Sequence, residues 1–226
     1  MRGRFITLEG IEGAGKSTQR DVVRACLLDA GVELTLTREP GGSEIAERMR
    51  ALLLDRANRG MDSNAELLLM FAARAEHLHK TILPALETGR WVLCDRFTDA
   101  TYAYQGGGRG LDRARIAQLE TFVQGLLRPD LTLLFDLPAA TGLARARGRS
   151  APDRFESEAL LFFDQVRAEY LRIAEREPGR VRRINAQGDV ASVAADVRLV
   201  ISEYLHATGQ ACRAASAPCS AATMRP

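Results

Sequence analysis

Gly10-Ile11-Glu12-Gly13-Ala14-Gly15-Lys16-Ser17 is the most informative stretch of this chain, because it fits the pattern G-x-x-x-x-G-K-[ST] at every fixed position. A β-rich run, residues 5–8, precedes it, and a segment of helical periodicity, residues 16–30, comes after it. Glycines allow backbone N–H groups to turn inward around a phosphate, and the helix N-terminus adds partial positive charge. The stretch therefore predicts a loop that binds the phosphates of a nucleoside triphosphate.

The same pattern assigns roles to the last residues of the loop. Lys16 is expected to reach the β- and γ-phosphates, and the Ser17 hydroxyl is expected to bind Mg²⁺. We predict an ATP site formed by Gly10, Ile11, Glu12, Gly13, Ala14, Gly15, Lys16, Ser17 and Thr18.

Lysine is scarce in this chain, and its scarcity excludes several classes of protein. The chain has 31 basic and 29 acidic residues, and only Lys16 and Lys80 among the basic ones are lysines. A lysine-rich patch for nucleic acid or membrane is therefore excluded, and we predict neither as a partner. Lys80 lies in His79-Lys80-Thr81-Ile82, which does not fit the N-K-x-D motif of guanine-specific GTPases, so we interpret it as a solvated helix residue.

The remaining composition is that of a globular protein of the cytoplasm. No apolar run reaches the roughly 18–20 residues that a membrane span needs, and residues 1–5 do not resemble a signal peptide. The cysteines are scattered without a C-x-x-C pair, which favours a reduced, cytoplasmic protein over a zinc or disulfide protein. They are Cys26, Cys94, Cys212 and Cys219.

Apolar strands alternate with helices along most of the chain, which predicts an α/β fold with a parallel sheet covered on both faces. The expected strands are 5–8, 33–37, 91–95, 131–137 and 181–185. The expected helices are 16–30, 43–54 with Ser43 as its cap, 65–86 with a break near Pro84, 112–127, 139–147, 157–176 and 190–206. We predict one domain over residues 1–206 and a disordered tail over residues 207–226.

Polar residues stand directly after the expected strands, where sites of such folds lie. Asp95 could orient Mg²⁺, and its neighbour Arg96 could bind a second phosphate. Asp136 is the alternative carboxylate for the metal, but we prefer Asp95 because of its arginine neighbour and the glycine run at residues 106–108. We expect that glycine run to form a mobile loop.

Four segments together resemble bacterial thymidylate kinase over about residues 3–206. They are the phosphate loop from Glu9 to Thr18, Arg38-Glu39-Pro40-Gly41-Gly42, Asp95-Arg96-Phe97, and Ala103-Tyr104-Gln105-Gly106-Gly107-Gly108-Arg109-Gly110. The resemblance implies a nucleoside monophosphate kinase that transfers the γ-phosphoryl group of ATP to dTMP, with Mg²⁺, in dTTP biosynthesis. It also implies a three-layer P-loop kinase fold with a five-stranded parallel sheet, a mobile lid and a homodimer.

The resemblance further implies which residues bind dTMP. Arg50 and Arg96 would hold the acceptor phosphate, Glu12 would contact the sugar or phosphate, and Arg74 would hydrogen-bond the base. The complete expected set is Glu12, Arg38, Pro40, Arg50, Phe71, Arg74, Arg96, Thr101, Tyr104 and Gln105.

Two members of this set have particular roles. In the family a ring often stacks on thymine four residues before the arginine; here that position is Met70, and we favour Phe71, three residues before Arg74, while leaving the choice open. Tyr104 matches the tyrosine that crowds the sugar 2′ position, which would favour deoxyribose.

An arginine-rich segment, residues 145–156, is interpreted as the lid rather than as a merely solvated loop. In the family the arginine that stabilises the transferred phosphoryl group comes from the P-loop or from the lid. This P-loop has no arginine, so the resemblance implies the lid-arginine type. The catalytic residues we expect are Lys16, Arg96, Arg147, Arg149 and Arg154.

Two other functions remain open on the sequence alone. One is a monophosphate kinase on the same plan that accepts a different base. The other is an NTP-dependent switch or regulatory module, which would hydrolyse NTP slowly and without an acceptor.

Overall fold

The computed structural model describes residues 2–147, 153–156 and 158–210 of the chain. Its strands form one sheet with the order β2-β3-β1-β4-β5, and all neighbouring strands are parallel. This confirms the predicted five-stranded parallel sheet. The strands are β1 (Phe5–Glu9), β2 (Leu34–Arg38), β3 (Trp91–Asp95), β4 (Leu131–Asp136) and β5 (Val181–Asn185).

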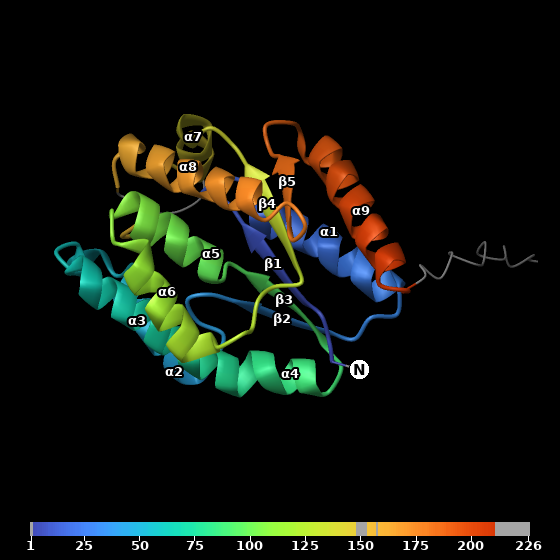
Figure 1. Cartoon of the computed structure of the whole chain (residues 1–226). Coiled ribbons are helices and arrows are strands. Elements are labelled where there is room, and N and C mark those ends of the chain that lie inside the picture. The colour runs from blue at the N-terminus through green and yellow to red at the C-terminus, as the bar shows by residue number, and fades with distance from the viewer. Residues whose placement is uncertain (1, 148–152, 157, 211–226) are drawn as a thin grey trace, which may run out of the picture.

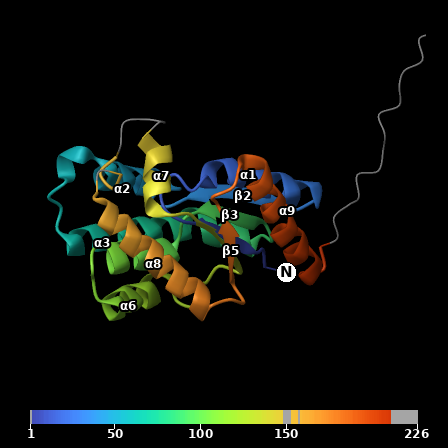
Figure 2. The ribbon, with the colours of Figure 1, turned by 90° about the horizontal axis from the view of Figure 1, so that it is seen from above.

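Helices cover both faces of the sheet, which makes three layers (Figures 1 and 2). Helices α1 and α9 pack together on one face and α8 lies on the other (Figure 2), where it packs against β4 and β5; α4 packs against β3. The helices are α1 (Lys16–Asp29), α2 (Glu44–Leu54), α3 (Ser63–His77), α4 (Leu83–Glu87), α5 (Thr98–Thr101), α6 (Arg113–Gln124), α7 (Ala139–Arg147), α8 (Leu160–Arg176) and α9 (Val190–Ala207). A 3₁₀ turn (Arg56–Asn58) and two π-helical segments (Leu78–Ile82 and Tyr102–Gly108) lie between these helices.

The central strands β1 and β4 are buried along their whole length. Strands that are covered on both faces need apolar side chains on both, which explains why the sequence shows apolar runs there instead of alternation. Ile6, Leu8, Leu133 and Phe135 belong to one large core cluster. This rigid core fixes the loops that leave the carboxyl ends of the strands.

The predicted long helix 65–86 is interrupted. Helix α3 ends at His77, a π-helical segment comes next, and α4 begins at Leu83 with Pro84 in its first turn. Proline has no N–H to donate and is tolerated in a first turn, so the predicted break at Pro84 is confirmed.

The predicted mobile loop around the glycine run is wrong. Residues 102–108 are π-helical and pack along α8. A Cβ on Gly107 would lie 2.9 Å from the carbonyl oxygen of Gln165, and one on Gly108 would collide with the Phe162 ring. The glycines therefore allow two helical segments to approach closely. The prediction of a loop failed because it considered only the tendency of glycine to form loops.

Strand pairing brings the two motif loops together. Leu8 in β1 lies opposite Asp95 in β3, so the phosphate loop and Asp95-Arg96 leave the same edge of the sheet side by side. At the far end of the chain, α9 extends one residue beyond the prediction, to Ala207. The predicted tail beyond Gln210 lies outside the described residues. No helix in the described part of the chain is long and apolar enough to cross a membrane.

Candidate active site

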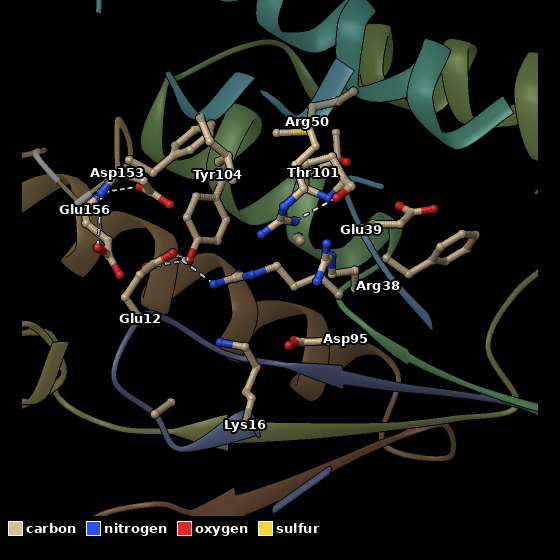
Figure 3. Close-up of a pocket in the computed structure, with 18 of the residues that line it drawn as sticks. Glu12, Lys16, Arg38, Glu39, Arg50, Asp95, Thr101, Tyr104, Asp153 and Glu156 are labelled. Atoms are coloured by element: carbon tan, nitrogen blue, oxygen red, sulfur yellow. Dashed lines mark hydrogen bonds and ion pairs between the residues drawn. The ribbon is translucent and has the colours of Figure 1, made fainter. Parts of the chain in front are cut away.

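One cavity collects most of the predicted site residues at the carboxyl edge of the sheet (Figure 3). Its walls come from the phosphate loop, the ends of β2 and β3, helices α2 and α3, the π-helical segment 102–108 and residues 153–156. The predicted residues that line it are Glu12, Gly13, Ala14, Gly15, Lys16, Ser17, Arg38, Pro40, Arg50, Arg74, Asp95, Arg96, Thr101, Tyr104 and Gln105. Gly10, Ile11, Thr18, Phe71 and Arg154 were also predicted, but they do not belong to this lining.

The phosphate loop has the backbone that its glycines predict. Gly10, Gly13 and Gly15 have φ values of 137°, 73° and 86°, which residues with a side chain rarely adopt. Gly15 directly precedes α1, so the loop opens at a helix N-terminus. The loop therefore opens at the positive end of a helix, where a phosphate is stabilised.

Lys16 points into the cavity from this loop (Figure 3). Its Nζ donates to the carbonyl oxygens of Gly10 and Ile11 at 2.9 and 3.0 Å. Burial, and next the positive charge of Arg96, lower the pKa of Lys16 to about 8. A bound anion would favour the cationic form of Lys16 and raise this pKa again.

The phosphate loop also touches the helix that leads into the predicted lid. A Cβ on Gly13 would collide with the carbonyl oxygen of Gly142 in α7, and a Cβ on Gly142 would lie 2.5 Å from the carbonyl oxygen of Glu12. The two backbones can approach this closely only because both positions are glycine. The position of α7 and the shape of the loop are therefore coupled by direct contact.

Asp95 and Ser17 fit a Mg²⁺ site. Both line the cavity, and Asp95 Oδ1 is buried without a hydrogen-bond partner in the described part of the chain. Mg²⁺ in phosphoryl-transfer sites takes one or two protein oxygens and completes its shell with water and substrate phosphate. No cluster of three or more His, Cys, Asp or Glu side chains suited to a metal occurs among the described residues.

Asp136, the alternative carboxylate, has a different role. Its side chain is bound by Arg167 at 2.7 Å and by Arg183 at 2.6 Å, and these contacts lower the pKa of Asp136 even though its burial raises it. It does not line the cavity. Asp136 therefore joins β4 to α8 and β5, and of these two carboxylates it is Asp95 that lines the cavity.

Three arginines face the cavity from different elements. Arg38 ends β2, Arg50 lies in α2, and Arg96 comes directly after β3. Burial lowers the pKa of Arg50, and the nearby charges of Arg38 and Arg96 lower it too. Like charges held this close favour a bound anion, which would relieve their repulsion.

Arg96 is held in an unusual conformation. Its φ of 69° is the only positive φ of a non-glycine residue among the described ones, and such a backbone costs about 1–2 kcal/mol. Its Nη2 donates to Glu12 Oε1 at 2.9 Å, and its guanidinium lies 4.7 Å from the centre of the Tyr104 ring. The Tyr104 hydroxyl lies 2.8 and 2.7 Å from the two carboxylate oxygens of Glu12. Glu12 thus ties Arg96 and Tyr104 to the phosphate loop.

Arg74 is clamped at the other end of the cavity. Its Nε donates to Glu39 Oε2 at 2.8 Å and its Nη2 to the Thr101 hydroxyl at 2.9 Å. The rings of Phe71 and Phe97 lie on the guanidinium at 4.9 and 5.0 Å from their centres. Nη1 is buried and has no partner among the described residues. That donor is available to a polar atom of a ligand.

Phe71 does not line the cavity, contrary to the prediction that its ring stacks on the base. Phe71 is 2% exposed and packs with Leu67 and Ile116 in a core cluster, whereas Met70 lines the cavity. Both residues share a helix face with Arg74, so spacing alone could not separate them. The π-face of Phe71 is used by Arg74.

The sequence does not single out His77, which binds Glu39, the carboxylate partner of Arg74. His77 is fully buried; its Nδ1 lies 3.0 Å from Glu39 Oε1 and its Nε2 lies 2.6 Å from the Thr37 hydroxyl. The i, i+3 spacing of Arg74 and His77 on α3 is the signal that could have indicated a shared partner.

The predicted lid is described only at its two ends. Arg149 and the side chain of Arg147 lie outside the described residues. Arg154 is 2% exposed; its Nη2 lies 2.7 Å from Glu66 Oε2, and its Nε donates to the Leu53 carbonyl oxygen at 2.7 Å. In this arrangement its guanidinium binds protein groups and not the cavity.

Acidic residues of the same segment were also missed. Asp153 and Glu156 line the cavity and cap one another, since each backbone N–H donates to the other's carboxylate, at 3.2 and 2.8 Å (Figure 3). Their pairing three residues apart is the pattern of a capping box, which the sequence does contain.

Comparisons with known proteins agree on one family. A family model described as "Thymidylate kinase" matches residues 8–197. A protein named "Thymidylate kinase" from Pseudomonas syringae pv. tomato is 59% identical over 205 residues, which cover 91% of this chain and 98% of that protein. One of the same name from Alkalilimnicola ehrlichii is 61% identical over 186 residues, 82% and 86% of the two chains. A crystal structure of thymidylate kinase from Ehrlichia chaffeensis superposes with a TM-score of 0.72 at 35% identity and covers 89% of this chain and 99% of its own.

Proposed function

The chain belongs to the thymidylate kinase family, and on that basis we propose that its cavity binds the triphosphate of ATP at one end and dTMP at the other. It is an ATP-dependent nucleoside monophosphate kinase, which transfers the γ-phosphoryl group of ATP to dTMP and yields ADP and dTDP in dTTP biosynthesis. Donor binding and acceptor binding fall to different groups of residues around the cavity, and phosphoryl transfer uses members of both groups together with the lid.

The observation that carries the assignment is the presence of two cationic centres in one cavity. Lys16 and the phosphate loop form one, and Arg38, Arg50 and Arg96 form the other. A reaction that joins two phosphates needs both, because the donor and the acceptor are anions that repel one another. Holding both in one geometry supplies most of the catalysis, since the attacking group is already a phosphate oxygen.

At the donor end, backbone N–H groups of residues 10–18 and Lys16 bind the triphosphate. Ser17 and Asp95 hold Mg²⁺, which supplies charge neutralisation on the phosphate oxygens when bound. Two observations support these residues as Mg²⁺ ligands. Asp95 Oδ1 is buried without a hydrogen-bond partner among the described residues, and Ser17 is exposed in the first turn of α1.

At the acceptor end, Arg50 and Arg96 hold the phosphate of dTMP, with Arg38 and Pro40 beside them. Arg74 offers its free Nη1 to a carbonyl oxygen of thymine, and Thr101 and Gln105 lie around the base. Met70 takes the place that we expected for Phe71 against the base. Tyr104, tied to Glu12, faces the sugar and disfavours a 2′-hydroxyl.

In the chemical step an oxygen of the dTMP phosphate forms a bond to the γ-phosphorus. The bond from that phosphorus to the β,γ-bridging oxygen breaks, and ADP leaves with its electron pair. The transferred group carries spread negative charge, which Lys16, Arg96 and a lid arginine stabilise. We assign the lid contribution to Arg147 and Arg149, and lid closure keeps water from the γ-phosphate.

Assay of ADP formation with ATP, Mg²⁺ and a panel of acceptors tests the assignment. We expect fast turnover with dTMP, slower turnover with dUMP, and little with AMP, CMP or GMP. An equal response across the panel would contradict the base contacts assigned to Arg74. Equal rates with and without acceptor would favour the regulatory NTPase.

A homodimer is part of the proposal. Helices α3 and α6 pack side by side (Figure 1), and they expose Leu68 (56%), Phe122 (85%) and, just after α6, Leu126 (100%). Exposed apolar side chains on two neighbouring helices fit a surface that a second copy of the chain covers. Light scattering after gel filtration should give twice the chain mass, and Phe122→Glu should give the chain mass with an unchanged fold; a wild-type monomer would contradict the dimer. A cytoplasmic location also stays a prediction.

A further inference from the structure

Arg96 needs support that the cavity residues do not supply. Its backbone is in the left-handed region, and its guanidinium must keep one direction in order to face the cavity. Glu12 and Tyr104 hold the guanidinium from the cavity side. Two further residues that the proposed function does not use, Glu9 and Tyr170, also contact this segment.

Glu9 is the last residue of β1, directly before the phosphate loop, and its side chain is fully buried. Its Oε1 accepts a hydrogen bond from the backbone N–H of Phe97 at 2.7 Å. The peptide group after Arg96 is therefore fixed by a side chain from the neighbouring strand. The orientation of this peptide is set by ψ of Arg96, and the left-handed conformation needs a matching φ and ψ, so this bond stabilises that backbone.

The other oxygen of Glu9 acts on the guanidinium. Oε2 accepts from the Tyr170 hydroxyl at 2.7 Å, and the same hydroxyl oxygen accepts from Arg96 Nη1 at 3.2 Å. Tyr170 lies in α8 and is 2% exposed, so this chain of bonds is shielded from water. The Tyr170 oxygen accepts from Arg96 through a lone pair while its hydrogen is directed to Glu9.

We propose that Glu9 and Tyr170 are positioning residues for the acceptor phosphate: Glu9 fixes the backbone after Arg96, and Tyr170 connects Glu9 to the guanidinium. One buried carboxyl group thereby sets both the backbone and the side chain of Arg96. The inference rests on the proposed role of Arg96 in binding dTMP. Burial, and next the charge of Asp99, raise the pKa of Glu9 to about 8. Glu9 supports Arg96 through its two hydrogen bonds, to the Phe97 N–H and to the Tyr170 hydroxyl.

Kinetics with each substrate varied in turn test this proposal. Tyr170→Phe removes one hydrogen bond to a charged group and keeps the ring, so we expect KM for dTMP to rise roughly tenfold while KM for ATP changes less than about twofold. Tyr204→Phe is the matched control, because the Tyr204 hydroxyl is buried without a partner among the described residues, far along the chain in α9. It should leave both KM values unchanged.

Glu9 is tested by a graded pair of substitutions. Glu9→Ala loses both hydrogen bonds, and we expect a larger rise in KM for dTMP than in Tyr170→Phe. Glu9→Gln keeps an oxygen for the Phe97 N–H and an amide N–H for the Tyr170 oxygen, so it should recover most of the wild-type value. Should Glu9→Ala fail to fold, the Gln variant and Tyr170→Phe still decide the question.

Arg96→Ala separates this inference from the function on which it rests. If Arg96→Ala binds dTMP like the wild type, the proposed role of Arg96 itself is wrong. If Arg96→Ala is impaired while Tyr170→Phe and Glu9→Ala are not, the positioning role alone is overturned. Adding Tyr170→Phe to Arg96→Ala should have no further effect on dTMP binding. Equal damage to ATP and dTMP kinetics, with a lower Tm, would mean a structural role only.

Discussion

Arg154 Nη2 lies 2.7 Å from Glu66 Oε2, and both side chains are almost completely buried. The same carboxylate binds Arg109 at 3.2 Å and accepts from the Gln105 amide through its other oxygen at 2.8 Å. Glu66 thus joins the end of the lid segment to α3 and to a residue of the cavity wall. The sequence predicts Arg154 as a catalytic residue, but in this arrangement its ion pair with Glu66 holds the lid segment against α3.

Arg154→Ala should therefore lower stability. It leaves Glu66 with one arginine fewer in a buried position, and breaking such a pair costs on the order of 3 kcal/mol. In a chain of this size that corresponds to a fall in Tm of about 6–12 °C, measurable by calorimetry. An unchanged Tm together with a large loss of kcat would instead support the catalytic role that the sequence predicts.

Arg149→Ala should show the opposite pattern. Its expected contribution is to the transferred phosphoryl group, so kcat should fall by roughly 100-fold or more with little change in Tm or in KM for dTMP. Steady-state kinetics with both substrates measure this. A rise in KM with unchanged kcat would mean that Arg149 contributes to ground-state binding.

Gly142→Ala should disturb the phosphate loop from outside it. The new Cβ would meet the carbonyl oxygen of Glu12 at 2.5 Å, which forces the backbone of the loop or of α7 to move. We expect a loss of about 1–3 kcal/mol in the free energy of unfolding and a higher KM for ATP. Gly60→Ala is the control, because no atom lies within 4 Å of its Cβ position; equal effects at both positions would disprove the contact.

Lys16 should give activity and stability opposite trends at alkaline pH. Its pKa is lowered to about 8 from 10.5 by burial and by Arg96, so the folded protein loses this proton before the unfolded chain does. The contribution of Lys16 to the free energy of unfolding therefore rises between about pH 8 and 10.5, whereas kcat/KM for ATP falls because the cation is needed.

Chemical denaturation and initial rates across that pH range test this point. Lys16→Met serves as the reference, since subtracting its unfolding free energy isolates the Lys16 contribution. If that difference stays constant from about pH 8 to 10.5, the lysine is not desolvated in the free protein. If kcat/KM for ATP stays constant up to about pH 10, the free enzyme keeps Lys16 charged.

The local parts of this fold could be read from the chain. The strands were found because burial on both faces demands continuous apolar runs, and the phosphate loop was found because its glycines and its strand–helix setting depend only on neighbouring residues. Asp95 and Arg96 were found because the carboxyl end of a parallel strand is where such sites lie. Each of these features is local, because it depends on one strand and the residues next to it.

Residues whose roles depend on distant partners could not be read in this way. Glu9 and Tyr170 are 161 positions apart, and neither stands out until β1 and α8 pack together. Arg154 looks like any other lid arginine until Glu66 lies beside it. The glycines at 107 and 108 gain their meaning from α8, and Phe71 differs from Met70 only by which side of α3 meets the core. Periodicity describes one element at a time, whereas these roles arise where two elements exclude water from the same polar groups.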